Sequence, residues 1–428
     1  MQYSTFAAID IGSYDVILEI FEISKKQGIR SVDKICHRME LGKDTYTLGK
    51  IRPEMEEELC RVLADFVRIM EGYRVDAYRA MASSAISEAA NSLYVLGKIR
   101  QLTGLSVTVL SNSEQRFLGY KALAAMEDNF NKIIEKGTAI LDLDGGSFQI
   151  SLFDKDALVT TQNIRMGSLR IRERLAGIQS ETEHYEEMVE ELIWNEVSSF
   201  KKMYLKDRKI ENIMLIGDVF TDSVYQNIEE KTTKIISREN FNTWYEKIIR
   251  QSPMELAVKL GIPLENASLM YPSAVIYKCL IDMMGAEHIW IPGVHMTRGI
   301  AYEYAEQMKL LKGGHNFEND ILMAAKNIGK RYAVNRPHVQ NLEMTALAMF
   351  DATKKMHGMK ERERLLLQMA VMLHDVGKYI SFNNVADSSY NIIMSNEIIG
   401  LSHIEREMVA LIARYNTVTL PSYDELVM

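Results

Sequence analysis

The sequence has few cysteines and no long apolar run. Its 428 residues include only 3 cysteines, and Cys36, Cys60 and Cys279 lie far apart, without the spacing of metal ligands. We therefore expect no disulfide framework, only reduced thiols in small apolar positions. No apolar stretch approaches the roughly 18 residues of a membrane-spanning helix. The N-terminus lacks the basic and apolar segments of a signal peptide, so we expect a cytoplasmic protein without a membrane partner.

The chain also has fewer basic than acidic residues. The chain has 50 Lys and Arg against 58 Asp and Glu, a net charge of −8. This balance argues against general nucleic-acid binding, although it leaves room for a local basic groove. With 47% hydrophobic and 25% charged residues, the chain has a globular composition, and its length predicts two or three domains.

Two similar strand–turn–strand patterns are the most informative feature of the sequence. An apolar run over 6–10 leads into Gly12 and Ser13, and a second run over 138–142 leads into the Asp-Gly-Gly-Ser of 144–147. Each turn is followed by another strand-like segment. This internal repeat predicts two similar α/β lobes that face each other across a cleft.

Glycine-rich turns of this kind suit phosphate binding. Without a Cβ, the backbone N–H groups can approach a phosphate, and an Asp at the end of the strand can hold a divalent metal beside it. A single such turn is as often a plain hairpin. Two of them in opposite lobes predict a site that grips a chain of phosphates.

In the order and spacing of its motifs, the chain resembles the exopolyphosphatase/guanosine pentaphosphate phosphohydrolase family. The motifs that carry this resemblance lie at residues 8–13, 82–91, 110–114, 142–147, 166–170 and 374–377. The resemblance implies an actin-like (ribonuclease H-like) two-lobed α/β core of the ATPase superfamily, with lobe I over 1–125 and lobe II over 126–312. An all-α HD-like domain would follow over 313–428, with Gly313 and Gly314 at the boundary.

The resemblance also implies an activity. Members of this family hydrolyse the terminal phosphoanhydride of polyphosphate or of guanosine pentaphosphate with a divalent metal, which predicts Mg²⁺ or Mn²⁺ here. Glu114 resembles the general base that activates water. The alternative interpretation, from the residue alone, is a solvated acid at the start of a helix, where the helix dipole favours negative charge. The positions that match metal-holding residues are Asp10 and Asp142, and we expect Asp144, beside them in the second turn, to hold the metal as well. The positions that match phosphate-binding residues are Gly12, Ser13, Gly145, Gly146, Ser147 and Arg170.

The chain departs from the family pattern at several phosphate-facing positions, where it gains carboxylates and loses cations. These departures are Tyr14, Asp15, Ser87, Asp144, Gln149 and Asp218. Each added carboxylate would weaken phosphate binding by roughly tenfold or more unless a metal lies between the two charges. An alternative function is therefore a catalytically weak or inactive member that binds a nucleotide or phosphate and acts as a regulatory protein.

The C-terminal region carries an incomplete HD pattern. His338, His374 and Asp375 have the order of its metal ligands, with His374 and Asp375 on a helix expected over 365–379. Ser388 stands where a further His is expected, and the chain ends before the last Asp of the pattern, as though truncated. Too few ligands remain for a di-metal site, so we expect a structural helical domain rather than a second phosphohydrolase.

The sequence leaves the substrate and the assembly open. Polyphosphate and the guanosine alarmone present the same terminal anhydride, and a homodimer is expected only from the resemblance. An arginine cluster either lines the cleft, where it would attract a polyanion, or forms a solvated helix face. Its members are Arg165, Arg170, Arg172 and Arg174.

Overall fold

The computed structural model describes residues 3–126, 130–155, 157–175, 185–227, 235–311 and 315–422. Its contacts divide the chain into an α/β unit over Met1–Asp156 and Gln162–His315, and a helical unit over Ala157–Thr161 and Asn316–Met428. The predicted boundary at Gly313 and Gly314 lies outside the described residues. Within the described ranges, no helix is both long and apolar enough to cross a bilayer.

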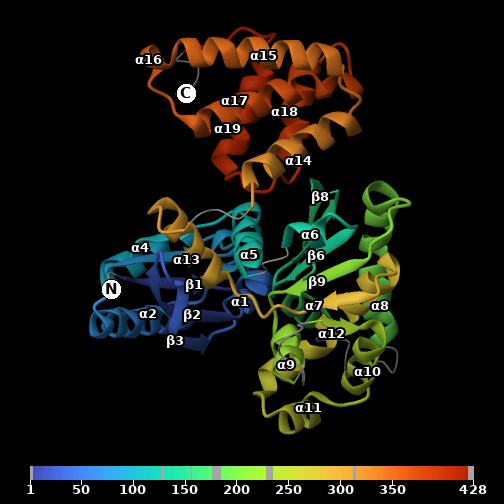
Figure 1. Cartoon of the computed structure of the whole chain (residues 1–428). Coiled ribbons are helices and arrows are strands. Elements are labelled where there is room, and N and C mark those ends of the chain that lie inside the picture. The colour runs from blue at the N-terminus through green and yellow to red at the C-terminus, as the bar shows by residue number, and fades with distance from the viewer. Residues whose placement is uncertain are drawn as a thin grey trace. The chain divides into compact units, whose positions relative to one another are not determined.

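The α/β unit is built on two mixed sheets (Figure 1). The first has the order β3-β2-β1-β4-β5 and consists of β1 (Ser4–Ile11), β2 (Asp15–Ser24), β3 (Gly28–Arg38), β4 (Ala77–Ala82) and β5 (Val107–Val109). The second has the order β10-β11-β9-β6-β7-β8 and consists of β6 (Thr138–Leu143), β7 (Phe148–Asp154), β8 (Ala157–Ile164), β9 (Asn212–Ile216), β10 (Ile235–Ser237) and β11 (His288–Trp290).

The two sheets repeat one topology. Strand β1 pairs antiparallel with β2 and parallel with β4, and β6 pairs in the same way with β7 and β9. The register repeats as well, because Asp10 lies opposite Ile17 and Asp142 lies opposite Gln149. Each acid is therefore the second-last residue of its strand. This duplication confirms the predicted pair of similar α/β lobes.

Helices cover both sheets. In the first lobe they are α1 (Leu41–Leu48), α2 (Pro53–Tyr73), α3 (Ser84–Ser87), α4 (Ser92–Thr103) and α5 (Asn112–Met126). In the second they are α6 (Phe130–Ile134), α7 (Ser168–Leu175), α8 (Tyr185–Phe200), the π-helical turn η1 (Lys201–Leu205), α9 (Val219–Asn227), α10 (Arg238–Ile249), α11 (Pro253–Leu260) and α12 (Leu264–Met284). The last helix of the unit, α13 (Met296–Gln307), returns to the first sheet.

Strands β1 and β2 are buried on both faces. One face packs against α2 and α4, and the opposite face packs against α13. Consequently β2 is buried from Val16 to Phe21 and again at Ile23, with only Glu22 partly exposed between them. The ends of these rigid strands carry the candidate site.

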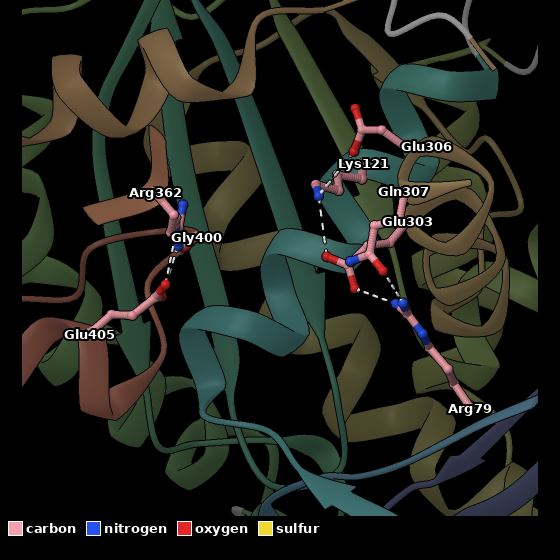
Figure 2. A network of polar contacts seen from close by, with 8 residues as sticks. All are labelled: Arg79, Lys121, Glu303, Glu306, Gln307, Arg362, Gly400 and Glu405. Carbon is pink, nitrogen blue, oxygen red and sulfur yellow. Dashed lines mark hydrogen bonds and ion pairs between the residues drawn. The ribbon is translucent and has the colours of Figure 1, made fainter. Parts of the chain in front are cut away.

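Helix α5 is fixed against α13 at a close crossing. Gly299 lies on the backbone of Leu118, and a Cβ at that glycine would come within 2.1 Å of the Leu118 carbonyl oxygen. One turn further along, Lys121 forms ion pairs with Glu303 at 3.2 Å and Glu306 at 3.4 Å (Figure 2). This anchoring matters because the N-terminal end of α5 faces the candidate site.

The helical unit confirms the predicted all-helical C-terminal region. Its elements are α14 (Phe317–Arg331), α15 (Arg336–Ala352), α16 (Lys354–His357), α17 (Glu361–Leu373), the 3₁₀ turn η2 (Val376–Tyr379), α18 (Val385–Ser395) and α19 (His403–Arg414). Arg362 joins α17 to α19 through Glu405 at 2.6 Å and also donates to the Gly400 carbonyl oxygen (Figure 2).

The helix expected over 365–379 is shorter than predicted. It ends at Leu373, so His374 and Asp375 lie in the connection to η2. A close approach by α18 accounts for the break, because a Cβ at Gly377 would lie 2.3 Å from the Val385 carbonyl oxygen. The apolar periodicity continues through the break and does not reveal it.

Candidate active site

The first turn joins β1 to β2 and carries Asp10 near its start. The Gly12 N–H donates to the Asp15 carbonyl oxygen at 2.8 Å, and a Cβ at Gly12 would lie 2.9 Å from that oxygen. The turn therefore requires glycine. Asp10 Oδ1 is buried without a hydrogen-bond partner among the described residues. Burial, together with the carboxylates of Asp15 and Asp144, raises the pKa of Asp10 well above its usual range.

The second turn joins β6 to β7, and its acid is paired. Asp142 Oδ1 accepts from Arg116 Nη1 at 2.6 Å, and Arg116 Nη2 also donates to the Ser147 carbonyl oxygen at 3.2 Å. Burial raises the pKa of Asp142 to about 6, against the opposing effect of the Arg116 charge. Asp144 Oδ1 accepts from the Gly145 N–H at 2.6 Å, so this carboxylate stabilises its own turn.

A third turn brings Asp218 to the same place. It follows β9, where Gly217 has a φ of 101° and lies so close to Asp142 that a Cβ would come within 2.7 Å of its Oδ1. Asp218 Oδ1 accepts from the Thr221 N–H at 3.1 Å, which caps the start of α9. Burial raises the pKa of Asp218 to about 7. Asp218 Oδ2 is buried and has no hydrogen-bond partner in the described part of the chain.

The three turns open on one cavity of about 430 Å³. Its lining combines acids with fewer cations and a group of apolar side chains. The acids are Asp10, Asp15, Asp142, Asp144, Asp218 and Asp222, and the charged or titratable nitrogen groups are Lys34, Arg38, Arg116 and His295. The described lining therefore has more acids than cations, and one of these cations, Arg116, is already paired with Asp142. A free polyanion would meet repulsion there unless cations entered with it.

These carboxylates suit a hard divalent cation that is shared with a substrate. No three His, Cys, Asp or Glu side chains of the described residues come together as a metal-binding group. Mg²⁺, however, is commonly held by one or two carboxylates together with substrate phosphates. The buried, unpartnered Oδ1 of Asp10 is an oxygen of the required kind. The donor set therefore fits Mg²⁺ or Mn²⁺ bound jointly with phosphate.

Two of the predicted residues have other partners. Glu114 Oε2 accepts from the Ser111 N–H at 2.9 Å and from Ser111 Oγ at 2.8 Å, the arrangement of a capping box at the start of α5. It is not among the residues that line the cavity. Arg170 Nη2 pairs with Glu88 at 3.0 Å, and its Nε donates to the Gly146 carbonyl oxygen at 2.9 Å.

The predicted phosphate-binding residues separate into two groups. Gly12 and Gly145 line the cavity together with the predicted metal-holding acids. Ser13 and Gly146 contact Tyr46, while Ser147 contacts Arg116 through its backbone and side-chain oxygens. The structure thus brings the acids together around the cavity but leaves part of the predicted cradle outside it.

Arg116 and Tyr46 are residues that sequence reasoning missed. On a helix, residues 114 and 116 point about 200° apart, so Glu114 and Arg116 cannot face the same cavity. Helical periodicity could have shown that only one of Glu114 and Arg116 faces the cavity. It could not have shown which of the two does. For Tyr46 the sequence offered no signal, because its role depends on contacts with turns distant in the chain.

The HD-like positions are close to one another in the helical unit. The rings of His338 and His374 have centroids 5.4 Å apart. His374 is buried with Nδ1 2.8 Å from the Val371 carbonyl oxygen, and Asp375 Oδ2 pairs with Lys378 at 3.0 Å. Ser389 Oγ donates to the His374 carbonyl oxygen at 3.0 Å. These contacts serve local structure at the end of α17.

Comparison with known proteins gives matches over most of the chain. The family model "Ppx/GppA phosphatase family" matches residues 20–308, and "Ppx/GppA phosphatase, domain III" matches residues 322–425. Among curated proteins, the guanosine-5'-triphosphate,3'-diphosphate pyrophosphatase of Photobacterium profundum is 19% identical over 98% of this chain and 82% of its own length. A bifunctional 3-dehydroquinate synthase/phosphatase of Fusobacterium nucleatum is 21% identical over 66% of this chain and 44% of its own length.

Solved structures support the fold. An exopolyphosphatase from Cytophaga hutchinsonii superposes with a TM-score of 0.60 at 16% identity, over 71% of this chain and 98% of that one. The Ppx/GppA family member of Aquifex aeolicus gives a TM-score of 0.58 at 17% identity, over 72% and 99% respectively. At these identities the likeness shows a shared fold, which is the predicted actin-like two-lobed core.

Proposed function

Because the chain belongs to the Ppx/GppA phosphatase family, we propose that it hydrolyses the terminal phosphoanhydride of polyphosphate or of guanosine pentaphosphate at the carboxylate-lined cavity. The observation that carries this proposal is the convergence of three turns, each with its acid, on one cavity. Phosphoryl transfer depends mainly on positioning and on neutralising charge, and rigid strand ends provide the positioning.

The proposed roles follow from the contacts of each residue. Asp10, Asp142 and Asp144 would hold Mg²⁺ or Mn²⁺, which when bound neutralises the charge of the phosphate oxygens. Gly12 and Gly145 leave room for a phosphate oxygen to approach the backbone. Arg116 holds Asp142 and the second turn in place from α5.

The activation of water has two candidate arrangements. Glu114 is the predicted base, and it would have to leave its capping box to reach the cavity. If it stays in the cap, a carboxylate of the turns must take the proton; our candidate is Asp144, which would then leave the metal to Asp10 and Asp142. Gln115 Nε2 donates to Asp144 Oδ2 at 3.4 Å, which orients that side chain from α5.

A second candidate function is favoured by two contacts. Glu114 is engaged at the helix start, and Arg170, the predicted phosphate-binding cation, is paired with Glu88. A chain whose base and cation are both engaged elsewhere would bind a phosphorylated ligand without turning it over. In that case the protein would be a catalytically weak, phosphate- or nucleotide-binding regulator.

Phosphate release from polyphosphate and from guanosine pentaphosphate, with Mg²⁺ or Mn²⁺, distinguishes these functions. Wild type is compared with Glu114→Gln, which keeps the capping box because glutamine also serves in it, and with Asp10→Asn. Release lost in both variants supports hydrolysis with Glu114 as base. Release lost only in Asp10→Asn removes Glu114 from the chemistry. No release by wild type, together with binding of either compound, supports the regulatory function.

Assembly and the helical unit are tested separately. The homodimer stays a prediction that light scattering of the purified protein checks. The HD-like residues His338, His374 and Asp375 stay a predicted remnant of a metal site. If elemental analysis finds iron or manganese held tightly by these residues, that interpretation is wrong.

A further inference from the structure

Tyr46 occupies the space between the two glycine turns. It lies on α1 in the first lobe and reaches residues of both turns. We call Ser13, Tyr46, Ser84, Gly146 and Arg170 the inner network. These residues are not among those that line the carboxylate cavity, although Ser13 and Gly146 are the chain neighbours of Gly12 and Gly145, which do.

The Tyr46 hydroxyl is surrounded by groups that would suit a phosphate oxygen. It lies 2.7 Å from Ser13 Oγ and 2.8 Å from Ser84 Oγ, and either hydroxyl in each pair can donate. A Cβ at Gly146 would lie 2.2 Å from the phenol oxygen, so the ring enters the space that this glycine leaves. Hydroxyl donors beside a glycine backbone are typical of an anion-binding site.

The cation of the inner network is held by the same tyrosine. The guanidinium carbon of Arg170 lies 3.9 Å from the centre of the Tyr46 ring. Its Nε donates to the Gly146 carbonyl oxygen, and Nη2 pairs with Glu88 at 3.0 Å. Residues predicted to bind phosphate are therefore assembled, and the phenol fills their centre.

We propose that Tyr46 determines how far a phosphate chain enters the site, because its phenol fills an inner phosphate position made by Ser13, Ser84 and Gly146. This inference rests on the proposed phosphate-binding function. The wild-type protein then takes phosphates only in the carboxylate cavity. A small side chain at position 46 opens the inner position, where the two serine hydroxyls and Arg170 are already in place.

The test is calorimetric binding of tripolyphosphate with Mg²⁺ to the full-length chain. We expect Tyr46→Ala to bind tripolyphosphate at least about tenfold more tightly than wild type. Tyr46→Phe should stay within about threefold of wild type, since its ring still fills the space. Tyr94→Ala is the matched control: this exposed tyrosine lies on α4, outside the cavity lining, and its loss should leave the affinity unchanged.

A double variant links the gain to the vacated space. In the Tyr46→Ala background, Gly146→Ala places a methyl group where the phenol oxygen was, so most of the gain should be lost. Melting temperatures of all variants show whether they fold, and Tyr46→Ser serves as a second opening variant if the alanine variant melts much earlier.

The outcomes separate this inference from the proposed function. If wild type binds tripolyphosphate and loses binding in Asp10→Asn, but folded Tyr46→Ala and Tyr46→Ser bind no more tightly, the role of Tyr46 is refuted and the cavity's function stands. If only the opened variants bind, Tyr46 blocks the site and hydrolysis by wild type is refuted. If no variant binds, both proposals fail.

Discussion

The two glycine turns share a backbone plan and differ in the charge around their acids. In both, the acid is the second-last residue of an apolar strand paired antiparallel with the next. Asp10 Oδ1 is buried without a hydrogen bond from the described residues, whereas Asp142 accepts from Arg116 at 2.6 Å. The pKa of Asp10 is raised well above its usual range, and that of Asp142 rises only to about 6.

This difference shows that duplicated turns need not have duplicated roles. Helix α5 supplies Arg116 to the second turn, whereas no described residue donates a hydrogen bond to Asp10 Oδ1 in the first. Asp142 therefore has a structural partner in addition to its proposed metal, and the Asp10 oxygen would be available to a cation that arrives with substrate. The following variants either remove this asymmetry or measure it.

Removing the cation of the second turn should have the largest effect. Arg116 is 3% exposed and Asp142 is 13% exposed. Arg116→Met leaves a largely buried carboxylate unpaired, so we expect the free energy of unfolding at pH 8 to fall by about 3 kcal/mol. Urea denaturation measures it. Adding Asp142→Asn should recover part of the loss, and a double variant as unstable as the single one would contradict the pairing.

Neutralising the acid of the first turn should remove activity but not stability. We expect Asp10→Asn to lower phosphate release about 100-fold or more, because a neutral amide replaces the carboxylate proposed to hold the metal. The same change removes the cost of ionising a buried acid, so the melting temperature should stay equal or rise. Full activity with Asn at this position would show that the first turn does not hold the metal.

The pH dependence of the free energy of unfolding measures what the burial of Asp218 costs. Because burial raises its pKa to about 7, the folded protein keeps a proton that the unfolded chain, with a pKa near 4, has released. Its contribution to the free energy of unfolding therefore falls as the pH rises from about 4 to about 7, by about 4 kcal/mol.

The matched variant for this effect is Asp218→Asn, since asparagine can still accept from the Thr221 N–H. Without added metal, the loss of stability between pH 5 and pH 8 should be smaller in the variant than in wild type. Parallel curves for the two proteins would show that Asp218 does not titrate in this range.

The smallest expected effect concerns Glu114. Glu114→Ala should cost about 1 kcal/mol of stability because the cap on Ser111 is lost, and Glu114→Gln should cost much less. Thermal unfolding of the two variants checks this difference. Equal melting temperatures for both would show that the capping box contributes little and that Glu114 is free to act elsewhere.

Local patterns were enough to predict the strands and turns of this fold. Apolar runs that end in an acid and a glycine-rich turn are short-range features, and β1–β2 and β6–β7 form where expected. Apolar residues three and four positions apart over 53–70 are typical of an amphipathic helix, and α2 forms there with Pro53 at its first position. The helix over 365–379 was predicted too long, because the approach of α18 to Gly377 is a tertiary contact.

The candidate site was less predictable than the fold. The sequence placed acids in the turns because each acid follows its own strand. It could not place Arg116, which reaches the second turn from a different lobe, nor Tyr46, which contacts three segments distant in the chain. Side-chain partners of this kind depend on where the elements pack.

By itself, the sequence determined the strand–turn–strand repeat, the two-lobed α/β class, the helical C-terminal region and the membership of a phosphatase family. The repeat, the α/β class and the helical region follow from periodicity over a few residues at a time, and the family follows from the resemblance of the motifs. Only the tertiary structure decided which acid is paired, which side of α5 faces the cavity and what fills the space between the turns. Those outcomes depend on burial and on charges brought together from distant segments, since the energy of a carboxylate is set by its surroundings rather than by its neighbours in sequence.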